Sequence, residues 1–303
     1  MPTLIVPRGR VDLSRVGMRA AAVRLVVDSG PRGVIDVDVE GVVVPMLVHA
    51  NAGFTVMLTH DALRRINGTR VAKETEFGLG ADLRVSDLGR GTTTLGSLAV
   101  AGSRLSDVRC EVFQLPTTNW EGMLGVGWLA AVEPVVDLAN RWLFVPTARQ
   151  RAEIDERLGA DATRVELTRD EMSDRYTSLV SVDSGGATSV TFVASTVADT
   201  IVDVEYARRC GIELGPVVGE EHGPTGAVVA NHRAKEPVRF YSSGDLIATL
   251  TPEVHDVYAY SGAERPTSSD AIGGYLGADL LLATGAILDF GQPRAAGGRV
   301  SGR

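Results

Sequence analysis

The residues best suited to chemistry follow an apolar stretch in the first third of the chain. Residues 42–48 read Val-Val-Val-Pro-Met-Leu-Val, and His49 and Asn51 come directly after them. A histidine can act as a general acid or base or donate a hydrogen bond to a ligand carbonyl, and a nearby amide can polarise the same group. The alternatives are a partly buried histidine bonded to a neighbouring carbonyl and an asparagine that serves as a turn residue. We therefore treat His49 and Asn51 as candidate catalytic residues.

The elements that would position these residues occur twice along the chain. A Thr-Val pair and an Ala/Arg-rich helix pattern at 55–66 match a Thr-Ile pair and a similar pattern at 200–210, an offset of 145 residues. An apolar Leu-Gly segment at 123–129 matches another at 275–281, an offset of 152 residues. Two similar offsets in the same order indicate duplicated lobes.

Each half has the pattern of an all-β domain. Residues 34–40 alternate between apolar and acidic side chains, and Glu40-Gly41 then predicts a tight turn into residues 42–48. The second half repeats this hairpin with residues 179–182 and 189–193. We place one lobe at 1–146 and the other at 179–303. The charged stretch 147–178 is expected to connect them, with a helix from Thr147 to Leu158 that ends at Gly159.

Taken together, these segments resemble the retropepsin-like aspartic protease superfamily in its tandem two-lobed form. In that family an apolar strand leads into Asp-Thr-Gly-Ala-Ser, a Thr-Val pair and a short helix follow, and the Leu-Gly strand passes beside the catalytic turn. The resemblance implies a bilobal all-β fold of two β-barrel lobes related by a pseudo-twofold axis, with the substrate in a cleft between them. His49 takes the place of the catalytic aspartate, and the offset of 145 aligns it with Ala194. Both catalytic aspartates are therefore expected to be replaced.

A competing interpretation retains the peptidase activity. Asp28-Ser29-Gly30 and Asp183-Ser184-Gly185 each contain the triplet that bilobal aspartic proteases use, one in each half. However, Pro31 follows the first triplet, and Asp-Ser-Gly is also an ordinary turn sequence. We favour hairpin turns for both segments and keep an active peptidase using Asp28 and Asp183 as the third hypothesis.

Further residues are expected to line the cleft if the resemblance holds. Asp199 is the candidate residual acid and the third candidate catalytic residue, whereas its alternative role is a solvated charge. Phe54, Trp120, Ser195 and Thr196 are expected to contact ligand. The alternative roles are core packing for Trp120 and hydrogen bonds to backbone groups for the two hydroxyls. Glycine-containing hairpins at 89–94 and 223–231 are candidates for the flaps that cover the cleft.

The composition excludes several classes of function. The 30 basic and 38 acidic residues give a net charge of −8 without a basic stripe, so nucleic acid is not an expected partner. The chain shows neither a secretion signal nor an apolar run of transmembrane length, which predicts a cytoplasmic protein without membrane contact. Cys110 and Cys210 are expected to be buried thiols. The histidines and cysteines form no ligand cluster, and we expect neither a metal nor a cofactor.

Two hypotheses of different class remain. The first is an enzyme whose cleft folds an extended apolar small molecule, such as a polyketide-like chain, for cyclisation or isomerisation, since such reactions need positioning and a polarising hydrogen bond. The second is a pseudoprotease that binds a peptide in the cleft by strand addition. The sequence favours the first only slightly.

Overall fold

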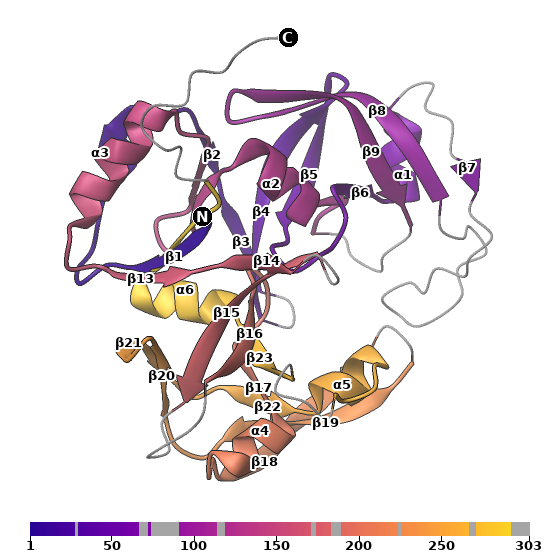
Figure 1. The fold of residues 1–303 in the computed structure, drawn as a ribbon. Helices are drawn as coiled ribbons and strands as arrows, with labels where there is room; N and C mark the ends of the chain where they lie inside the picture. Colours follow the sequence, from indigo (N-terminus) through magenta and orange to yellow (C-terminus); the bar gives the residue numbers. More distant parts are fainter. Residues whose placement is uncertain are drawn as a thin grey trace.

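The computed structural model shows two lobes built mostly from β-strands (Figure 1). Lobe one contains most of the first half of the chain and lobe two most of the second, and a sheet shared by both halves lies beside them. The structure describes residues 1–27, 30–66, 72–73, 91–113, 119–170, 174–182, 189–223, 226–266 and 271–291.

Lobe one is a closed barrel. Its sheet runs β3-β4-β5-β10-β6-β9-β8-β7, and a further pairing of β4 with β8 closes the ring. The short helices α1 and α2 follow β6 and β10 along the chain. The elements are β3 (Arg24–Val27), β4 (Pro31–Val39), β5 (Val42–Val48), β6 (Val56–Leu58), α1 (His60–Arg65), β7 (Ala72–Lys73), β8 (Gly91–Val100), β9 (Ser103–Val112), β10 (Gly122–Leu124) and α2 (Val126–Val132).

Lobe two repeats this arrangement. The order β15-β16-β23-β17-β22-β19 corresponds to β4-β5-β10-β6-β9-β8, with parallel pairs at the same places in both lobes. The pairing of β15 with β20 corresponds to that of β4 with β8. The elements are β14 (Thr168–Asp170), β15 (Arg175–Val182), β16 (Val190–Ala194), β17 (Ile201–Asp203), α4 (Val204–Arg209), β18 (Leu214–His222), β19 (Val228–Ala234), β20 (Val238–Ser242), β21 (Asp245–Leu250), β22 (Glu253–His255), α5 (Val257–Ser261), β23 (Ile272–Leu276) and α6 (Ala278–Thr284).

The shared sheet joins equivalent strands of the two halves. Its order is β13-β1-β24-β11-β12-β2, and in its centre β11 and β24 pair antiparallel with Val136 opposite Leu288. This register places Val135 opposite Asp289, as a pseudo-twofold axis through the Val136–Leu288 pair requires. The all-β, two-lobed architecture predicted from the sequence is confirmed. The remaining elements are β1 (Thr3–Val6), the 3-10 helix η1 (Ser14–Val16), β2 (Ala20–Ala22), β11 (Val135–Asp137), β12 (Trp142–Phe144), α3 (Ala148–Leu158), β13 (Thr163–Glu166) and β24 (Ile287–Asp289).

The β4–β5 hairpin forms as its sequence predicts. Buried Val37 and Val39 alternate with exposed Asp36 and Asp38, so one face of β4 packs into the barrel. The turn residues Glu40 and Gly41 both have positive φ, 53° and 85°, which is the backbone twist that a two-residue hairpin turn needs.

The predicted helix of the connector is also present. Thr147 caps α3, its hydroxyl accepting the Gln150 N–H while the Gln150 side chain accepts the Thr147 N–H at 2.9 Å. Gly159 follows the last helical residue. The connector also supplies β13 to the shared sheet, and lobe-two strands begin at β14; the predicted domain boundaries themselves stay a prediction.

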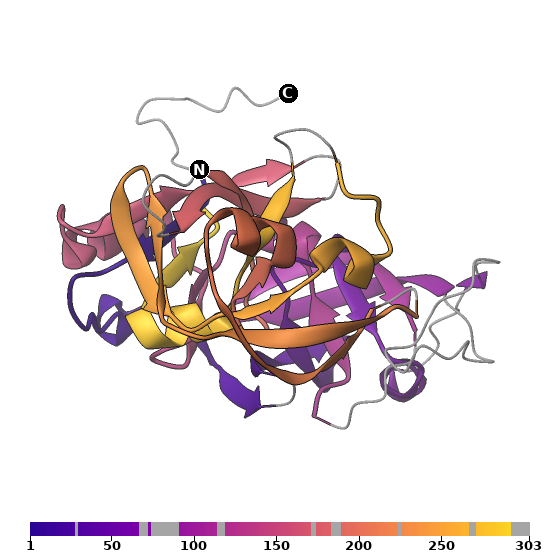
Figure 2. The same cartoon turned by 90° about the horizontal axis from the view of Figure 1, so that it is seen from below.

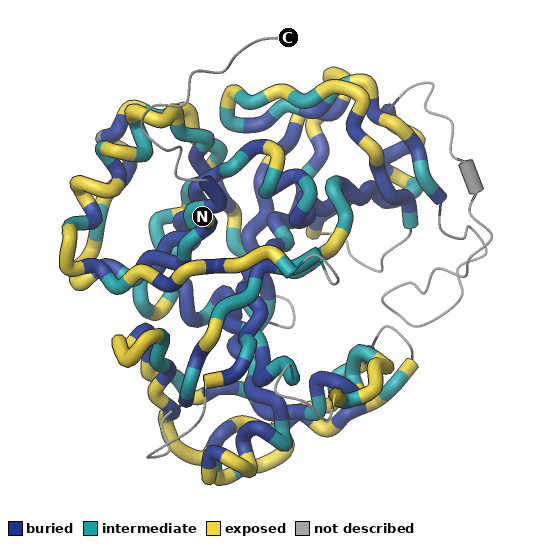
Figure 3. The backbone as a smooth tube through the Cα atoms, in the orientation of Figure 1, coloured by how far each residue is buried: buried dark blue, intermediate teal, exposed yellow. Residues whose placement is uncertain are grey.

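Buried residues follow the strands through the centre of both lobes and between them, whereas much of β18 is exposed (Figure 3). One continuous apolar cluster contains residues of both halves, which makes the two lobes one packed body. Cys110 and Cys210 are buried thiols, as predicted. In the part of the chain that the structure describes, no helix is long and apolar enough to cross a membrane.

Candidate functional site

The candidate site forms where the turns after β5 and β16 meet. Val48 pairs with Leu124 on β10, and Ala194 pairs with Leu276 on β23. The next residue in each lobe, His49 or Ser195, donates its N–H to that same leucine carbonyl at 2.9 Å. His49 is therefore equivalent to Ser195, and its alignment with Ala194 is wrong by one residue.

The error arises because the two turns differ in length. Ala52 and Ala198 are equivalent. The Ala52 carbonyl accepts the N–H of the first residue of α2, and the Ala198 carbonyl accepts the N–H of the first residue of α6, both at 2.9 Å. Leu58 and Val202 are also equivalent, because they pair with Gly122 and Gly274. Six positions separate Ala52 from Leu58 but only four separate Ala198 from Val202. The lobe-two turn is thus two residues shorter, and a single offset of 145 cannot align the residues on both sides of the deletion.

Thr196 ties the two turns together. Its hydroxyl donates to the Val48 carbonyl at 2.7 Å and accepts the Ala50 N–H at 3.0 Å, and the side chain is fully buried. Ala50 is the equivalent residue in lobe one and has no hydroxyl to return the contact. The lobes are thus joined at this point by one threonine from lobe two.

His49 stays neutral at physiological pH. Burial, followed by the nearby charge of Arg32, lowers the pKa of His49 to about 4, whereas a hydrogen bond with Asn51 opposes the shift. Nδ1 of His49 is buried and has no hydrogen-bond partner among the described residues. A neutral imidazole with a free ring nitrogen can exchange a hydrogen bond with a ligand but is a poor stand-in for a carboxylate.

The Ser195 hydroxyl forms two hydrogen bonds within its own turn. It donates to the Val197 carbonyl at 2.8 Å and accepts the Val197 N–H at 3.2 Å. Oδ1 of Asn51 lies 3.5 Å from the same hydroxyl. The structure therefore brings together His49, Asn51, Ser195 and Thr196, as the sequence predicted.

Phe54 and Trp120 lie beside these turns in a small apolar cluster. Trp120 is 5% exposed and packs with Val197 of lobe two, and Phe54 packs at the edge of the same cluster and contacts Phe113 edge to face. Trp120 is mainly a packing residue here. Phe54 is only partly buried and also lines a surface cavity with Arg109.

Asp199 belongs to a different environment. Its charged neighbours are Asp279 and Glu253, and an Arg233 guanidinium nitrogen lies 3.7 Å from its carboxylate. Burial, followed by the charges of Asp279 and Glu253, raises the pKa of Asp199. Asp199 thus joins a group of acidic side chains in lobe two, and no described contact links it to His49.

The Asp-Ser-Gly triplets fall largely outside the described residues, because Asp28, Ser29 and residues 183–188 are not described. The strands that flank them are not equivalent. The first triplet precedes β4, whereas the second follows β15, and β4 and β15 hold the same place in their lobes.

The predicted flap segments lie in corresponding hairpins. β7 pairs with the start of β8 in lobe one, but residues 74–90 lie outside the described part of the chain. In lobe two β18 and β19 form a long hairpin that reaches α5, and an added Cβ at Gly223 would meet the Tyr260 carbonyl (Figure 2). Only this second hairpin can be followed almost to its tip.

Sequence reasoning missed two groups of polar residues near this site. Arg32 forms a β-bridge with Val197 and places a positive charge near His49. Glu221, Asn231 and Glu253 gather on one face of the β18-β19-β22 sheet. The only local signal for the second group was the strand-like alternation of Glu253 and His255 about Val254.

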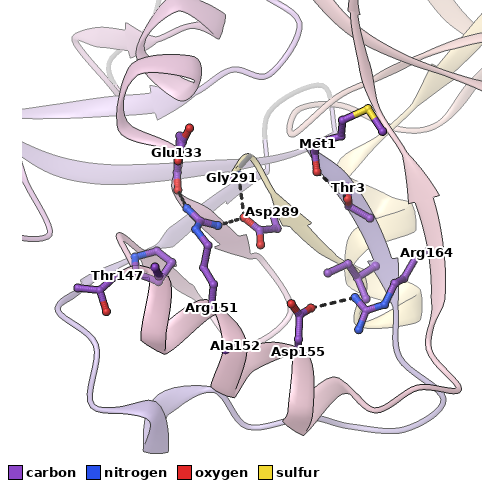
Figure 4. A pocket seen from close by; sticks show the side chains of 13 residues that line it. Met1, Thr3, Glu133, Thr147, Arg151, Ala152, Asp155, Arg164, Asp289 and Gly291 are labelled. Carbon is purple, nitrogen blue, oxygen red and sulfur yellow. Dashed lines mark hydrogen bonds and ion pairs between the residues drawn. The ribbon is translucent and has the colours of Figure 1, made fainter. Parts of the chain in front are cut away.

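A cavity lined by described residues lies away from these turns. It has a volume of about 600 Å³ and lies between α3 and the shared sheet. Figure 4 shows Arg151 pointing toward Asp289 and the Glu133 carbonyl, while Arg164 pairs with Asp155 at 3.2 Å. Its charges are thus satisfied within the protein. Within the described ranges, no group of three or more His, Cys, Asp and Glu side chains could hold a metal ion.

Comparison with known proteins gives structural neighbours only: no family model and no curated protein matches the chain. An aspartic proteinase from Irpex lacteus is 12% identical, with 89% of this chain and 97% of that one covered and a TM-score of 0.48. Basic 7S globulin from soybean is 12% identical over 90% of this chain and 95% of that one, with a TM-score of 0.42. A retropepsin-like aspartic protease from Rickettsia conorii is 15% identical over 41% of this chain and 90% of that one, with a TM-score of 0.28.

Proposed function

We propose that this protein has kept an aspartic-protease-like fold without the peptidase reaction, and that its site between the lobes binds an extended apolar small molecule. The observation that carries the proposal is the pair His49 and Ser195 at the equivalent positions of the two turns. Aspartic peptidases need two carboxylates close enough to share one proton, which supplies an acid and a base around one water. A neutral imidazole opposite a hydroxyl that is bonded within its own turn cannot supply this acid and this base.

The remaining groups suit a reaction that needs positioning. His49 keeps one ring nitrogen without a partner among the described residues, and Asn51 lies beside it. The partly buried Phe54 provides apolar surface next to them, against a cluster that contains the buried Val197. Cyclisation or isomerisation of a polyketide-like chain requires a folded substrate conformer and a hydrogen bond that polarises a carbonyl. His49 is the group we assign to that hydrogen bond.

The ligand can be sought by native mass spectrometry of the full chain after incubation with a metabolite extract and with a peptide library. We expect a small apolar molecule to be retained, and His49→Gln to weaken its retention. His60→Gln, a histidine change at the start of α1, is the matched control. Retention of peptides alone would support the pseudoprotease alternative and overturn this proposal.

Peptidase activity is tested separately with fluorescent casein between pH 3 and pH 7. We expect no cleavage. Cleavage that is abolished by Asp28→Asn or Asp183→Asn would establish an active peptidase and refute the assignment of His49 and Ser195 as the functional pair.

A further inference from the structure

One face of the β18-β19-β22 sheet collects acidic and amide side chains. The register places Arg233 opposite Glu253 and Gly219 opposite Asn231, so these positions share a face with Glu221. The Asn231 amide nitrogen donates to Glu253 Oε2 at 2.8 Å and lies 3.4 Å from Glu221 Oε1. A Cβ built at Gly219 would meet no atom within 4 Å, so this face has open space at Gly219, directly across from the buried Asn231.

Two buried side chains on this face carry polar atoms that have no hydrogen-bond partner among the described residues. Asn231 is 2% exposed, and its Oδ1 has no hydrogen bond in the described structure. His255 is 3% exposed, and neither ring nitrogen has a partner there. Rotating the Asn231 amide would not help, because its carbonyl would then face two carboxylates. Buried polar atoms are nearly always paired in folded proteins, so unpaired acceptors at an open position indicate a missing donor.

The charges around the face are mostly negative. Burial and the charge of Glu253 raise the pKa of Glu221. The pKa values of Asp199 and Asp279 are also raised, chiefly by burial. The groups that face this region are the acids Glu221, Glu253, Asp199, Asp279, Asp203 and Asp256, the bases Arg32, Arg233 and Arg265, the imidazoles of His222 and His255, and the phenol of Tyr260.

We propose that the face formed by Glu221, Asn231 and Glu253 is a binding site for an organic ammonium group. An ammonium has three donors and no acceptor, which matches two carboxylates and the unpaired Asn231 carbonyl. A neutral alcohol brings one donor and no positive charge. An Arg233 guanidinium nitrogen lies 3.4 Å from Glu253 Oε1, so an ammonium would add a second positive charge to a face with two carboxylates. This proposal concerns lobe two alone and does not depend on the reaction assigned to His49.

The test uses the full chain with benzylammonium as probe and benzyl alcohol as its neutral counterpart, measured by calorimetry and by the NMR signal of the His255 ring. Benzylammonium is expected to bind more tightly than the alcohol and to shift the His255 signal. Glu221→Gln removes one charged acceptor with little change in shape and should weaken benzylammonium binding about tenfold or more.

Glu220→Gln is the matched control, because Glu220 is the neighbouring residue on β18 and points to the opposite, exposed face. It should leave binding unchanged. If Glu221→Gln fails to fold, Glu253→Gln gives the same test from the other carboxylate. Equal binding of benzylammonium and benzyl alcohol, or equal weakening by Glu220→Gln and Glu221→Gln, would overturn the proposal.

Discussion

Thr196→Val is the substitution that most directly tests how the lobes are joined. Valine keeps the branched shape of threonine but leaves the Ala50 N–H and the Val48 carbonyl without the hydroxyl that now satisfies both, at 3.0 and 2.7 Å. Each buried polar group left unpaired costs about 1–3 kcal/mol. Because both groups lie in the fully buried contact between the lobes, we expect the free energy of unfolding to fall by about 2–4 kcal/mol.

The measurement is urea unfolding followed by tryptophan fluorescence and by far-ultraviolet circular dichroism. Trp120, Trp128 and Trp142 all lie in the first half of the chain, so fluorescence reports on that half and dichroism on the whole. Thr196→Ser keeps the hydroxyl and should cost only about 1 kcal/mol for the lost methyl group. A Thr196→Val protein within about 0.5 kcal/mol of the native chain, or a Thr196→Ser protein as unstable as Thr196→Val, would refute the role of these bonds.

Three further predictions concern His49, a glycine contact and the connector helix. The pKa of His49 is about 4 in the folded state against 6.5 ordinarily, so the unfolded chain binds this proton more readily. The contribution of neutral His49 to the free energy of unfolding is therefore complete above pH 6.5 and is lost as the pH falls toward 4. Urea unfolding from pH 7.5 to 4 should show a weaker pH dependence in His49→Gln. Gly277→Ala places a Cβ 2.4 Å from the Asp199 carbonyl carbon and should lower the unfolding free energy by about 1–3 kcal/mol, whereas Gly9→Ala meets no atom within 4 Å and should not. Thr147→Ala removes the cap of α3 and should cost about 1 kcal/mol in the same urea assay, while Thr147→Ser should be nearly neutral.

Much of the fold was predictable because its signals are local or repeated. The β4–β5 hairpin follows from alternating residues and a Glu-Gly turn, and α3 follows from a threonine cap and a terminal glycine. The duplicated order of the Thr-Val and Leu-Gly segments indicated two similar lobes. Each of these features depends on neighbours along the chain or on one segment resembling another.

The candidate site was only partly predictable. His49, Asn51, Ser195 and Thr196 were identified, but the partner of His49 in lobe two was misassigned by one residue. A deletion inside a turn leaves no mark in a fixed sequence offset, whereas hydrogen bonds to Leu124 and Leu276 define the equivalence. One residue matters here because it exchanges an apolar Ala194 for a hydroxyl.

The sequence by itself determined the strand periods, the turn and cap chemistry, the duplication, and the residues other than aspartate at positions 49 and 195. Only the tertiary structure decided which residues of the two lobes face each other, that the Thr196 hydroxyl bonds the turn of the other lobe, and that Glu221, Asn231 and Glu253 share one face. The physical reason is that side chains alternate between the faces of a strand, and strands far apart in sequence are brought into register by backbone hydrogen bonds. Residues that flank one another in the sequence, such as Glu220 and Glu221, therefore serve opposite sides of the sheet.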